Sequence, residues 1–551
     1  MPEKMTDRRI QWDLPLAVLM LALFVFAMFA GTMIYHRDMI FDDSFISYRY
    51  AKNLAQGYGP TWNPGEAPTE GYTNFLFVVL LAPFIRMGMN PLLVARIISL
   101  LATAGLALLC CLLSQMHGAA RRSRSVLFAL AFIAATRTDL LVMLGLETVL
   151  YAFFLFLAFL LSVVHLRSRS SAALSGVGIC SLAAGLLRPE GILLPAVLAG
   201  VLLIAQPERK KTFMQLVRCW LFTLALPMAI YMGWKRLYYG SFLPNPFFIK
   251  ASAGGFIRPE GFWSVLDFLS YHRALVVLML MSLFVKPAVC LPRARIYAGS
   301  IVAVYLLFYL RVDTLMDACG RFLYPLAPIL LFLALPAIDK LLDAIARARL
   351  PQAVTCALLC AAFILLFYFD PHGAVLSTRK AMLGKSAYPN PESLMQKEYR
   401  VAKKLSEYAD IQNVRIACGD SGVIAYFTGA KFLDTVGLND GFIARNRDID
   451  LLTDYFFGEK PTLVFAMANK DHTWIDYGHG PLLKRTDWMR DPRWDDYIYA
   501  GTITTSGGMY DIHLMLRKDY EQMEELADFL AARIADRMYD PFPLPIGTYV
   551  P

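Results

Sequence analysis

Long apolar segments follow one another through the first two thirds of the chain. The first, Leu14 to Tyr35, follows a short basic stretch and contains no A-x-A cleavage site, so we expect an uncleaved membrane span with the N-terminus in the cytoplasm. Of the 551 residues, 57% are hydrophobic and only 18% are charged, whereas soluble domains carry about 25% charged residues. The sequence therefore predicts a polytopic α-helical membrane protein.

Short runs of Lys and Arg set the expected orientation of the spans. Tyr72–Met87 has 16 residues and reaches roughly 24 Å as a helix, less than the ~30 Å hydrocarbon core. If it crossed the membrane, Arg121, Arg122 and Arg124 would lie outside; if it lies in the outer leaflet, they lie inside, as the positive-inside rule favours. We therefore expect about eleven spans, with the C-terminus outside: Leu14–Tyr35, Val94–Gln115, Val126–Ala135, Thr148–His165, Ser171–Leu187, Ile192–Ala205, Phe213–Trp234, Leu266–Val285, Ile296–Leu310, Phe322–Pro336 and Val354–Phe369.

The composition changes at Asp370, where charges become spread throughout the chain. Strand-like runs alternate with helix-like stretches at 393–409 and 519–537, which predicts a small α/β domain over 370–551 on the outer side of a membrane domain over 1–369. The strand-like runs are Val414–Cys418, Lys431–Asp434, Thr462–Ala466, Tyr497–Thr504 and Tyr510–Leu516. Gly419-Asp420-Ser421-Gly422 is typical of a strand-to-helix turn with an Asp or Ser cap; a phosphate-binding turn is the alternative.

Polar residues that interrupt the apolar pattern gather on the predicted outer side. They are Asp42, Asp43, Glu66, Glu70, Arg137, Asp139, Glu147, Arg188, Glu190, Asn245, Lys250, Asp313, Asp317 and Arg321. Each alone is more often a paired residue at the end of a span, but their convergence on one face indicates a site. For a lipid phosphate substrate, the arginines and Lys250 would bind the phosphate, and Asp42 or Asp43 would deprotonate an incoming hydroxyl.

Three aromatic side chains of the first outer loop, Tyr58, Trp62 and Tyr72, would stack on a sugar or anchor the loop at the membrane interface. The nine cysteines show no metal-ligand spacing, and Cys319 and Cys418 fall in regions placed outside, where a disulfide between them is one option. The net charge of +9 is distributed over short loops rather than one face, which argues against nucleic-acid binding.

Several motifs carry a resemblance to a known family, and they occur in order along most of the chain. They are Asp42–Leu54, Gly57–Glu66, Glu70–Asn74, Gly145–Glu147, Leu187–Gly191, Tyr238–Phe247, Gly320–Pro328 and Gly419–Asp440. In them the chain resembles GT-C fold glycosyltransferases, in particular the mycobacterial terminal arabinofuranosyltransferase B type and its bacterial relatives. The resemblance implies a GT-C fold in the bacterial inner membrane, with juxtamembrane helices in the first periplasmic loop, residues 36–91.

The resemblance also implies a reaction. A polyprenyl-phosphate donor would supply a sugar such as arabinofuranose to a hydroxyl of a cell-envelope glycan or a surface protein such as a pilin. Asp42 matches the catalytic base, with Asp43 beside it, and Arg188 and Arg321 match positions suited to the donor phosphate. Some members need a divalent cation and others do not; beyond Asp42 and Asp43 the sequence offers no ligand set. Direct inversion needs one carboxylate, whereas retention would also need a nucleophile such as Glu147 or Asp43.

Two other functions are compatible with an apolar scaffold of this kind. A transporter or flippase for a lipid-linked sugar would show paired half-helices, midplane ionisable groups and internal pseudo-symmetry, and the sequence shows none of these. A non-catalytic envelope assembly factor would tolerate the loss of both Asp42 and Asp43.

Overall fold

The computed structural model describes residues 14–35, 40–116, 122–205, 207–251, 258–285, 292–312, 314, 317–347, 391–419, 422–468, 491–504 and 511–536. The chain forms two compact units. The helical unit is Met1–Arg37, Ala95–Tyr231 and Gly254–Lys385, and the mixed unit is Asp38–Val94, Met232–Ala253 and Ser386–Pro551. The first predicted outer loop thus belongs to the same unit as the C-terminal part. The predicted boundary between 369 and 370 lies outside the described residues and stays a prediction.

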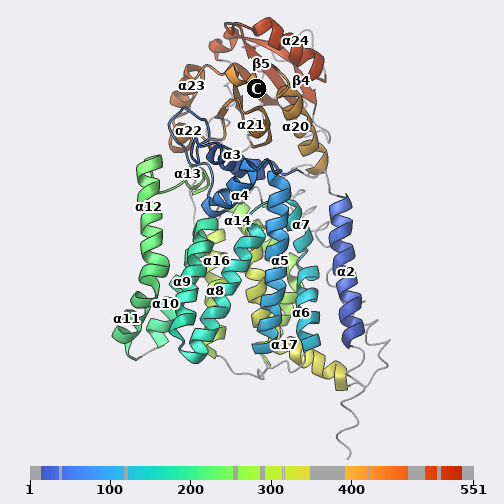
Figure 1. The fold of residues 1–551 in the computed structure, drawn as a ribbon, viewed down its shortest axis with the longest axis vertical. Coiled ribbons are helices and arrows are strands. Elements are labelled where there is room, and N and C mark those ends of the chain that lie inside the picture. Colours follow the sequence, from blue (N-terminus) through green and yellow to red (C-terminus); the bar gives the residue numbers. More distant parts are fainter. Residues whose placement is uncertain are drawn as a thin grey trace, which may run out of the picture. The chain divides into compact units, whose positions relative to one another are not determined.

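Apolar helices make up the helical unit. In Figure 1, α8 and α9 run side by side, and contacts also join α10 to α16 and α15 to α17. The helices are α2 (Leu14–Tyr35), α5 (Pro91–Met116), α6 (Arg122–Ala135), α7 (Thr138–Met143), α8 (Thr148–Ser168), α9 (Ser171–Leu187), η1 (Pro189–Ile192), α10 (Leu193–Ala205), α11 (Arg209–Trp220), η2 (Leu221–Ala225), α12 (Leu226–Tyr239), α14 (Pro259–Tyr271), α15 (Arg273–Met281), α16 (Pro292–Tyr309), η3 (Ala318–Gly320), η4 (Tyr324–Leu326) and α17 (Ala327–Arg347); the first residues of α5 and the last of α12 fall in the mixed unit.

Among the described residues, four helices are long and apolar enough to cross a membrane: Pro91–Met116, Thr148–Ser168, Arg209–Tyr239 and Ala318–Leu341. A bent pair, Pro259–Tyr271 with Arg273–Met281, makes a fifth if it counts as one span. Shorter apolar helices cover Leu21–Ile34, Phe75–Arg86, Ser171–Leu187 and Pro189–Ala205. The prediction of a polytopic helical membrane protein is confirmed, while the expected last span, Val354–Phe369, lies outside the described residues.

Two expected spans differ from the structure. The segment 266–285 is broken at His272, where α14 and α15 meet at an angle of 75°. The helix expected to end at Pro336 continues to Arg347. Proline removes a helical hydrogen bond, and here Ser282 replaces part of the ladder: its hydroxyl donates to the Ala334 carbonyl at 3.2 Å and accepts the Ala337 N–H at 3.1 Å. Nearby serines satisfy such backbone groups inside membrane helices.

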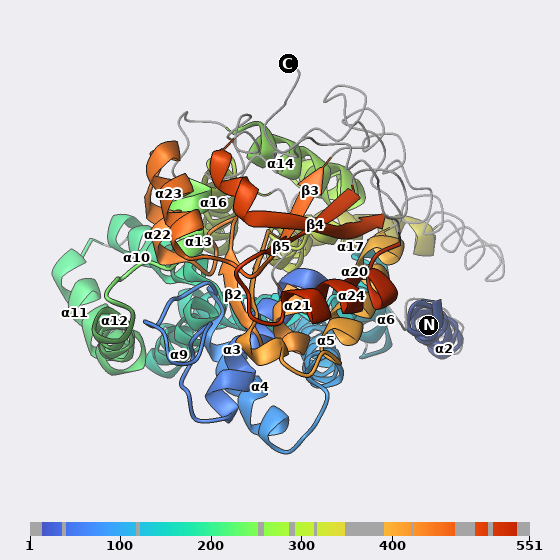
Figure 2. The same cartoon turned by 90° about the horizontal axis from the view of Figure 1, so that it is seen from above.

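The mixed unit contains a five-stranded sheet in the order β2-β1-β3-β5-β4. β1 pairs in parallel with β2 and β3, whereas β5 is antiparallel to β3 and β4; Figure 2 shows α24 beside β4. The elements are α3 (Asp42–Ala55), α4 (Phe75–Arg86), α13 (Asn245–Ala251), α20 (Pro391–Leu405), η5 (Ile411–Asn413), β1 (Arg415–Cys418), α21 (Gly422–Thr428), β2 (Lys431–Asp434), α22 (Gly441–Arg445), α23 (Ile449–Gly458), β3 (Leu463–Ala468), η8 (Pro492–Asp496), β4 (Tyr497–Thr504), β5 (Asp511–Arg517) and α24 (Met523–Arg533). The predicted small α/β domain and its five strands are confirmed.

Arg49 of α3 joins the first loop to the C-terminal part of the chain. Its guanidinium donates to the Trp62 carbonyl at 2.9 Å, to the Ala430 carbonyl at 2.8 Å, and to the carbonyl of Ala425. It also donates to Asn63 Oδ1 at 3.1 Å. Burial lowers the pKa of Arg49 to about 10, so the group stays charged at neutral pH. A buried charge is tolerated only when it is well hydrogen-bonded. Two of the four acceptors lie in the first loop, and the other two lie in the C-terminal part of the chain.

Gly422 permits a close backbone approach between α21 and α3. A Cβ atom at this position would lie 2.0 Å from the Asp42 carbonyl oxygen, a distance that no substituted residue can adopt without moving the backbone. The second glycine of the Gly419–Gly422 motif is therefore required by packing against Asp42.

Replacing Gly422 by alanine should destabilise the protein by about 1–3 kcal/mol, the usual cost of overpacking. Gly458→Ala is the matched control, because a Cβ at Gly458, the last residue of α23, has no atom within 4 Å. Melting temperatures of the two purified variants in detergent measure the difference. Equal melting temperatures would show that the close approach to Asp42 is not a constraint.

Candidate functional site

Arg188 is the centre of a buried ionic cluster in the helical unit. α9 ends at Leu187, and Arg188 takes an extended conformation before η1 begins. Its Nη1 lies 3.1 Å from Glu147 Oε1 and its Nε lies 2.6 Å from Glu190 Oε1. The Tyr309 hydroxyl also donates to Glu190. The structure thus brings together three residues singled out from the sequence, and two carboxylates share one guanidinium.

Arg321 belongs to the same part of the helical unit. The guanidinium carbon of Arg188 lies 4.8 Å, and that of Arg321 4.9 Å, from the ring centroid of Phe322, so both predicted phosphate-binding arginines surround one aromatic ring. Asp317 accepts the Phe322 N–H at 3.0 Å. Stacking on an aromatic face leaves the edge of a guanidinium available for bidentate hydrogen bonds.

Arg137 is held in a different arrangement. It adopts a left-handed conformation with φ of 48° and contacts Asp139 through both Nε, at 3.1 Å, and Nη2, at 3.2 Å. The Thr32 hydroxyl donates to the same carboxylate at 2.6 Å. This bidentate pair favours a role in fixing the turn before α7 over phosphate binding.

In the mixed unit, Asp42 caps a helix that lies 380 residues further along the chain. Its Oδ2 accepts the Gly422 N–H at 3.0 Å and its Oδ1 accepts the Val423 N–H at 2.6 Å. These are the first N–H groups of α21, which the helix itself cannot pair. The caps expected from the sequence, Asp420 or Ser421, lie outside the described residues. Asp43, the second acid, is half-buried next to this contact.

Glu70 and Lys235 form a buried ion pair in the mixed unit, with Nζ and Oε2 2.9 Å apart. The Asn245 N–H donates to the Glu70 carbonyl at 2.9 Å. The hydroxyls of Tyr72 and Tyr239 lie 3.0 Å apart. Sequence reasoning missed Lys235 and Tyr239; the signal available was a lysine directly after the last tryptophan of an apolar segment.

Trp62 and Asn245 are buried, and each keeps a polar group without a partner. Trp62 is 1% exposed, with Arg49 over its ring at 4.6 Å and Phe432 at 6.1 Å between centroids. Its indole N–H and the side-chain amide nitrogen of Asn245 have no hydrogen-bond partner among the described residues. Buried donors of this kind normally have an acceptor, so a ligand hydroxyl or water is expected there. Lys250, the remaining predicted residue, is half-buried in the last turn of α13.

The cysteines and the possible metal ligands are the remaining groups with reactive side chains. Cys319 is an exposed free thiol of the helical unit, and Cys418 is a buried free thiol of the mixed unit; a disulfide between them stays a prediction. Within the described ranges, no group of three or more His, Cys, Asp and Glu side chains is placed to hold a metal ion.

Comparison with known proteins identifies the fold. The crystal structure of ArnT from Cupriavidus metallidurans bound to undecaprenyl phosphate matches with a TM-score of 0.53 and 14% sequence identity, over 91% of this chain and 98% of that one. The apo structure of the same protein matches with a TM-score of 0.49 and 15% identity, over 90% and 97%. The GT-C fold predicted from the sequence is confirmed. Residues 392–535 match the family model of a domain of unknown function, DUF8728. A search of curated proteins gave no match.

The Glu70–Lys235 pair should make stability depend on pH. Burial raises the pKa of Glu70 to about 7, although the Lys235 ammonium lowers it. Because the unfolded carboxyl has a pKa of about 4.3, the folded protein binds more protons between these values, and this contribution to stability is lost as the pH rises through 7. The melting temperature of wild type relative to Glu70→Gln should therefore fall between pH 5 and pH 8. A difference that is constant or rises with pH would contradict this assignment.

Proposed function

We propose that this protein is a membrane glycosyltransferase that moves a sugar from a polyprenyl-phosphate donor to an acceptor hydroxyl on the periplasmic side. The observation that carries the proposal is the GT-C fold, shared over 91% of the chain with a protein bound to undecaprenyl phosphate. We infer that the sugar is a pentofuranose such as arabinofuranose, and that the acceptor is a cell-envelope glycan or a surface protein. The motif resemblance from Asp42 to Asp440 supports these finer assignments.

The catalytic base is proposed within the adjacent pair Asp42 and Asp43. The N–H groups of Gly422 and Val423 orient the Asp42 carboxylate, and a carboxylate has about four lone-pair sites in all. Removal of a proton from the acceptor hydroxyl by one of these acids would activate it for attack on the anomeric carbon. We propose that one of the two acids takes the proton and that the other positions the acceptor hydroxyl. Single variants of Asp42 and Asp43 distinguish the two roles.

The donor phosphate is proposed to bind beside Phe322, where Arg188 and Arg321 converge. Glu147 and Glu190 fix the orientation of Arg188, at the cost of neutralising it. An incoming phosphate can exchange with one of these carboxylates, because a guanidinium forms bidentate bonds to either anion. Arg188 would then stabilise the charge that develops on the leaving polyprenyl phosphate.

Recognition of the sugar or the acceptor is proposed for the buried polar groups around Glu70. Tyr72, Asn245 and Trp62 belong to this set, and the unpaired N–H groups of the last two are directional donors for ligand hydroxyls. A buried donor built to bind a hydroxyl discriminates strongly against analogues that lack it.

Single variants of the two acids test the base. In wild type, purified protein with a polyprenyl-phosphate arabinofuranose donor and a glycan acceptor should form a new glycoside. Asp42→Asn should lower the free energy of unfolding by about 1 kcal/mol, because an amide nitrogen cannot accept a backbone N–H of α21. Its melting temperature should therefore fall. Asp43→Asn is the matched variant of the neighbouring acid. Transfer should be lost in at least one variant, and wild-type transfer in both would contradict the proposed base. Movement of the donor across a vesicle membrane without formation of a glycoside would identify a transporter.

Arg188→Lys tests the phosphate site. Lysine keeps the charge but not the planar fork, so we expect the donor kcat/KM to fall at least tenfold, a loss of about 1.4 kcal/mol of transition-state stabilisation. Arg167→Lys, at an exposed position in the last turn of α8, is the control and should keep wild-type kinetics. Unchanged donor kinetics in Arg188→Lys would exclude a direct contact with the phosphate.

A further inference from the structure

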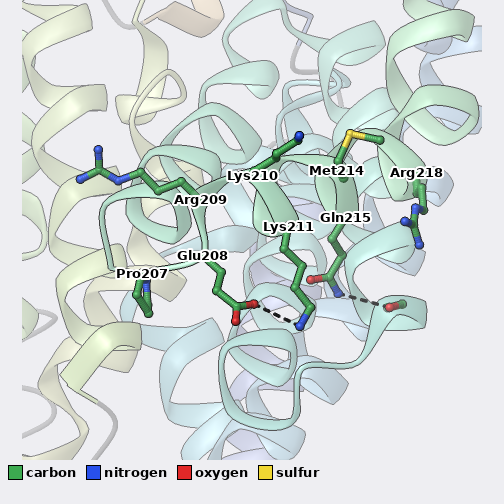
Figure 3. Close-up of a pocket in the computed structure, with 9 residues that line it drawn as sticks. Pro207, Glu208, Arg209, Lys210, Lys211, Met214, Gln215 and Arg218 are labelled. Atoms are coloured by element: carbon green, nitrogen blue, oxygen red, sulfur yellow. Dashed lines mark hydrogen bonds and ion pairs between the residues drawn. The ribbon is translucent and has the colours of Figure 1, made fainter.

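A basic pocket opens at the start of α11, in the helical unit and apart from the clusters described above. Its volume is about 900 Å³, and four cationic side chains line it: Arg209, Lys210, Lys211 and Arg218. Glu208 is its one acidic lining residue and lies 3.1 Å from Lys211, as Figure 3 shows. Four positive charges against one negative charge leave the pocket with a strong attraction for anions.

Two uncharged polar side chains, Ser171 and Gln215, also line the pocket, together with Pro207 and Met214. Gln215 of α11 donates to the Ser171 hydroxyl of α9 at 3.3 Å (Figure 3). The pocket is therefore built from two helices, and hydrogen-bond donors accompany its charges. Such a mixture is suited to phosphate oxygens, which accept bonds from guanidinium, ammonium, amide and hydroxyl groups.

The helix that carries this pocket faces lipid along most of its length. Only 11% of the apolar part of Arg209–Tyr239 is buried inside the protein, and Phe213, Phe222 and Ile230 are strongly exposed. The helix has 31 residues and measures roughly 46 Å, whereas the hydrocarbon core is ~30 Å thick. The expected span Phe213–Trp234 has 22 residues and measures roughly 33 Å, which is sufficient to cross the core. This leaves Arg209, Lys210 and Lys211 at the level of the headgroups.

We propose that this pocket binds the phosphate headgroup of an anionic phospholipid whose acyl chains lie along α11 and α12. The positive charges of the pocket favour an anionic ligand. The exposed apolar side chains that follow them favour a ligand whose anionic group is attached to hydrocarbon chains. Basic pockets at the ends of membrane helices recognise anionic headgroups in this way. The site is independent of the proposed transferase reaction, since it shares no residue with the Arg188 cluster.

A general attraction of positive loops for the membrane surface is the competing explanation, and matched variants separate the two. The pocket variant is Arg209→Gln/Lys210→Gln/Arg218→Gln, which leaves the Glu208–Lys211 pair intact. The control variant removes three exposed positive charges that do not line the pocket, Arg167→Gln/Arg293→Gln/Lys340→Gln. Both variants change the net charge by the same amount.

The measurement is the melting temperature of purified full-length protein in detergent, titrated with phosphatidylglycerol, phosphatidylcholine or inorganic phosphate. We expect saturable stabilisation by phosphatidylglycerol only, an apparent affinity at least tenfold weaker in the pocket variant, and a change below twofold in the control. Equal weakening in both variants, equal stabilisation by phosphatidylcholine, or stabilisation by inorganic phosphate alone would overturn the proposal. If the pocket variant melts lower without lipid, the single variant Arg218→Gln is compared with Arg293→Gln under the same criteria.

Discussion

The contact between the start of α3 and the start of α21 is the constraint on which the rest of the mixed unit depends. Asp42 satisfies N–H groups of α21, and Gly422 lets the two backbones meet. Arg49 lies seven residues after Asp42 in α3, and its guanidinium donates hydrogen bonds to two carbonyls of the C-terminal part. Buried polar groups without partners are costly, so neither segment would be stable in this form without the other. The C-terminal part therefore helps to hold Asp42 in place.

The two polar clusters solve the problem of burial differently. In the mixed unit, Arg49 donates to neutral carbonyl and amide oxygens, which do not repel one another as two carboxylates would. In the helical unit, Arg188 is paired with two carboxylates that compete for it. Because the two carboxylates repel one another, a phosphate can replace one of them more easily than it can replace a neutral oxygen at Arg49. This contrast supports a role of Arg49 in folding and the role in phosphate binding that we propose for Arg188.

Much of the architecture could be predicted because it depends on local patterns. The apolar segments located the helices, and the strand-like runs located all five strands to within two residues. The clustering of Arg188 with Glu147 and Glu190 was predicted as a shared face. The cap that Asp42 provides and the partner of Glu70, Lys235, were not predicted, because contacts between distant segments leave no periodic signal. The span was expected to end at Pro336, but the helix continues, and Ser282, directly after α15, bonds to backbone groups on both sides of the proline.

The central claim is that acids of the first loop act on a lipid-linked donor whose phosphate binds at the two stacked arginines. The most direct test is an experimental structure of the full-length protein with undecaprenyl phosphate. The account predicts phosphate density within hydrogen-bond distance of Arg188 or Arg321, with Asp42 or Asp43 facing the same space. A phosphate bound away from both arginines, or both acids turned away from it, would contradict the account.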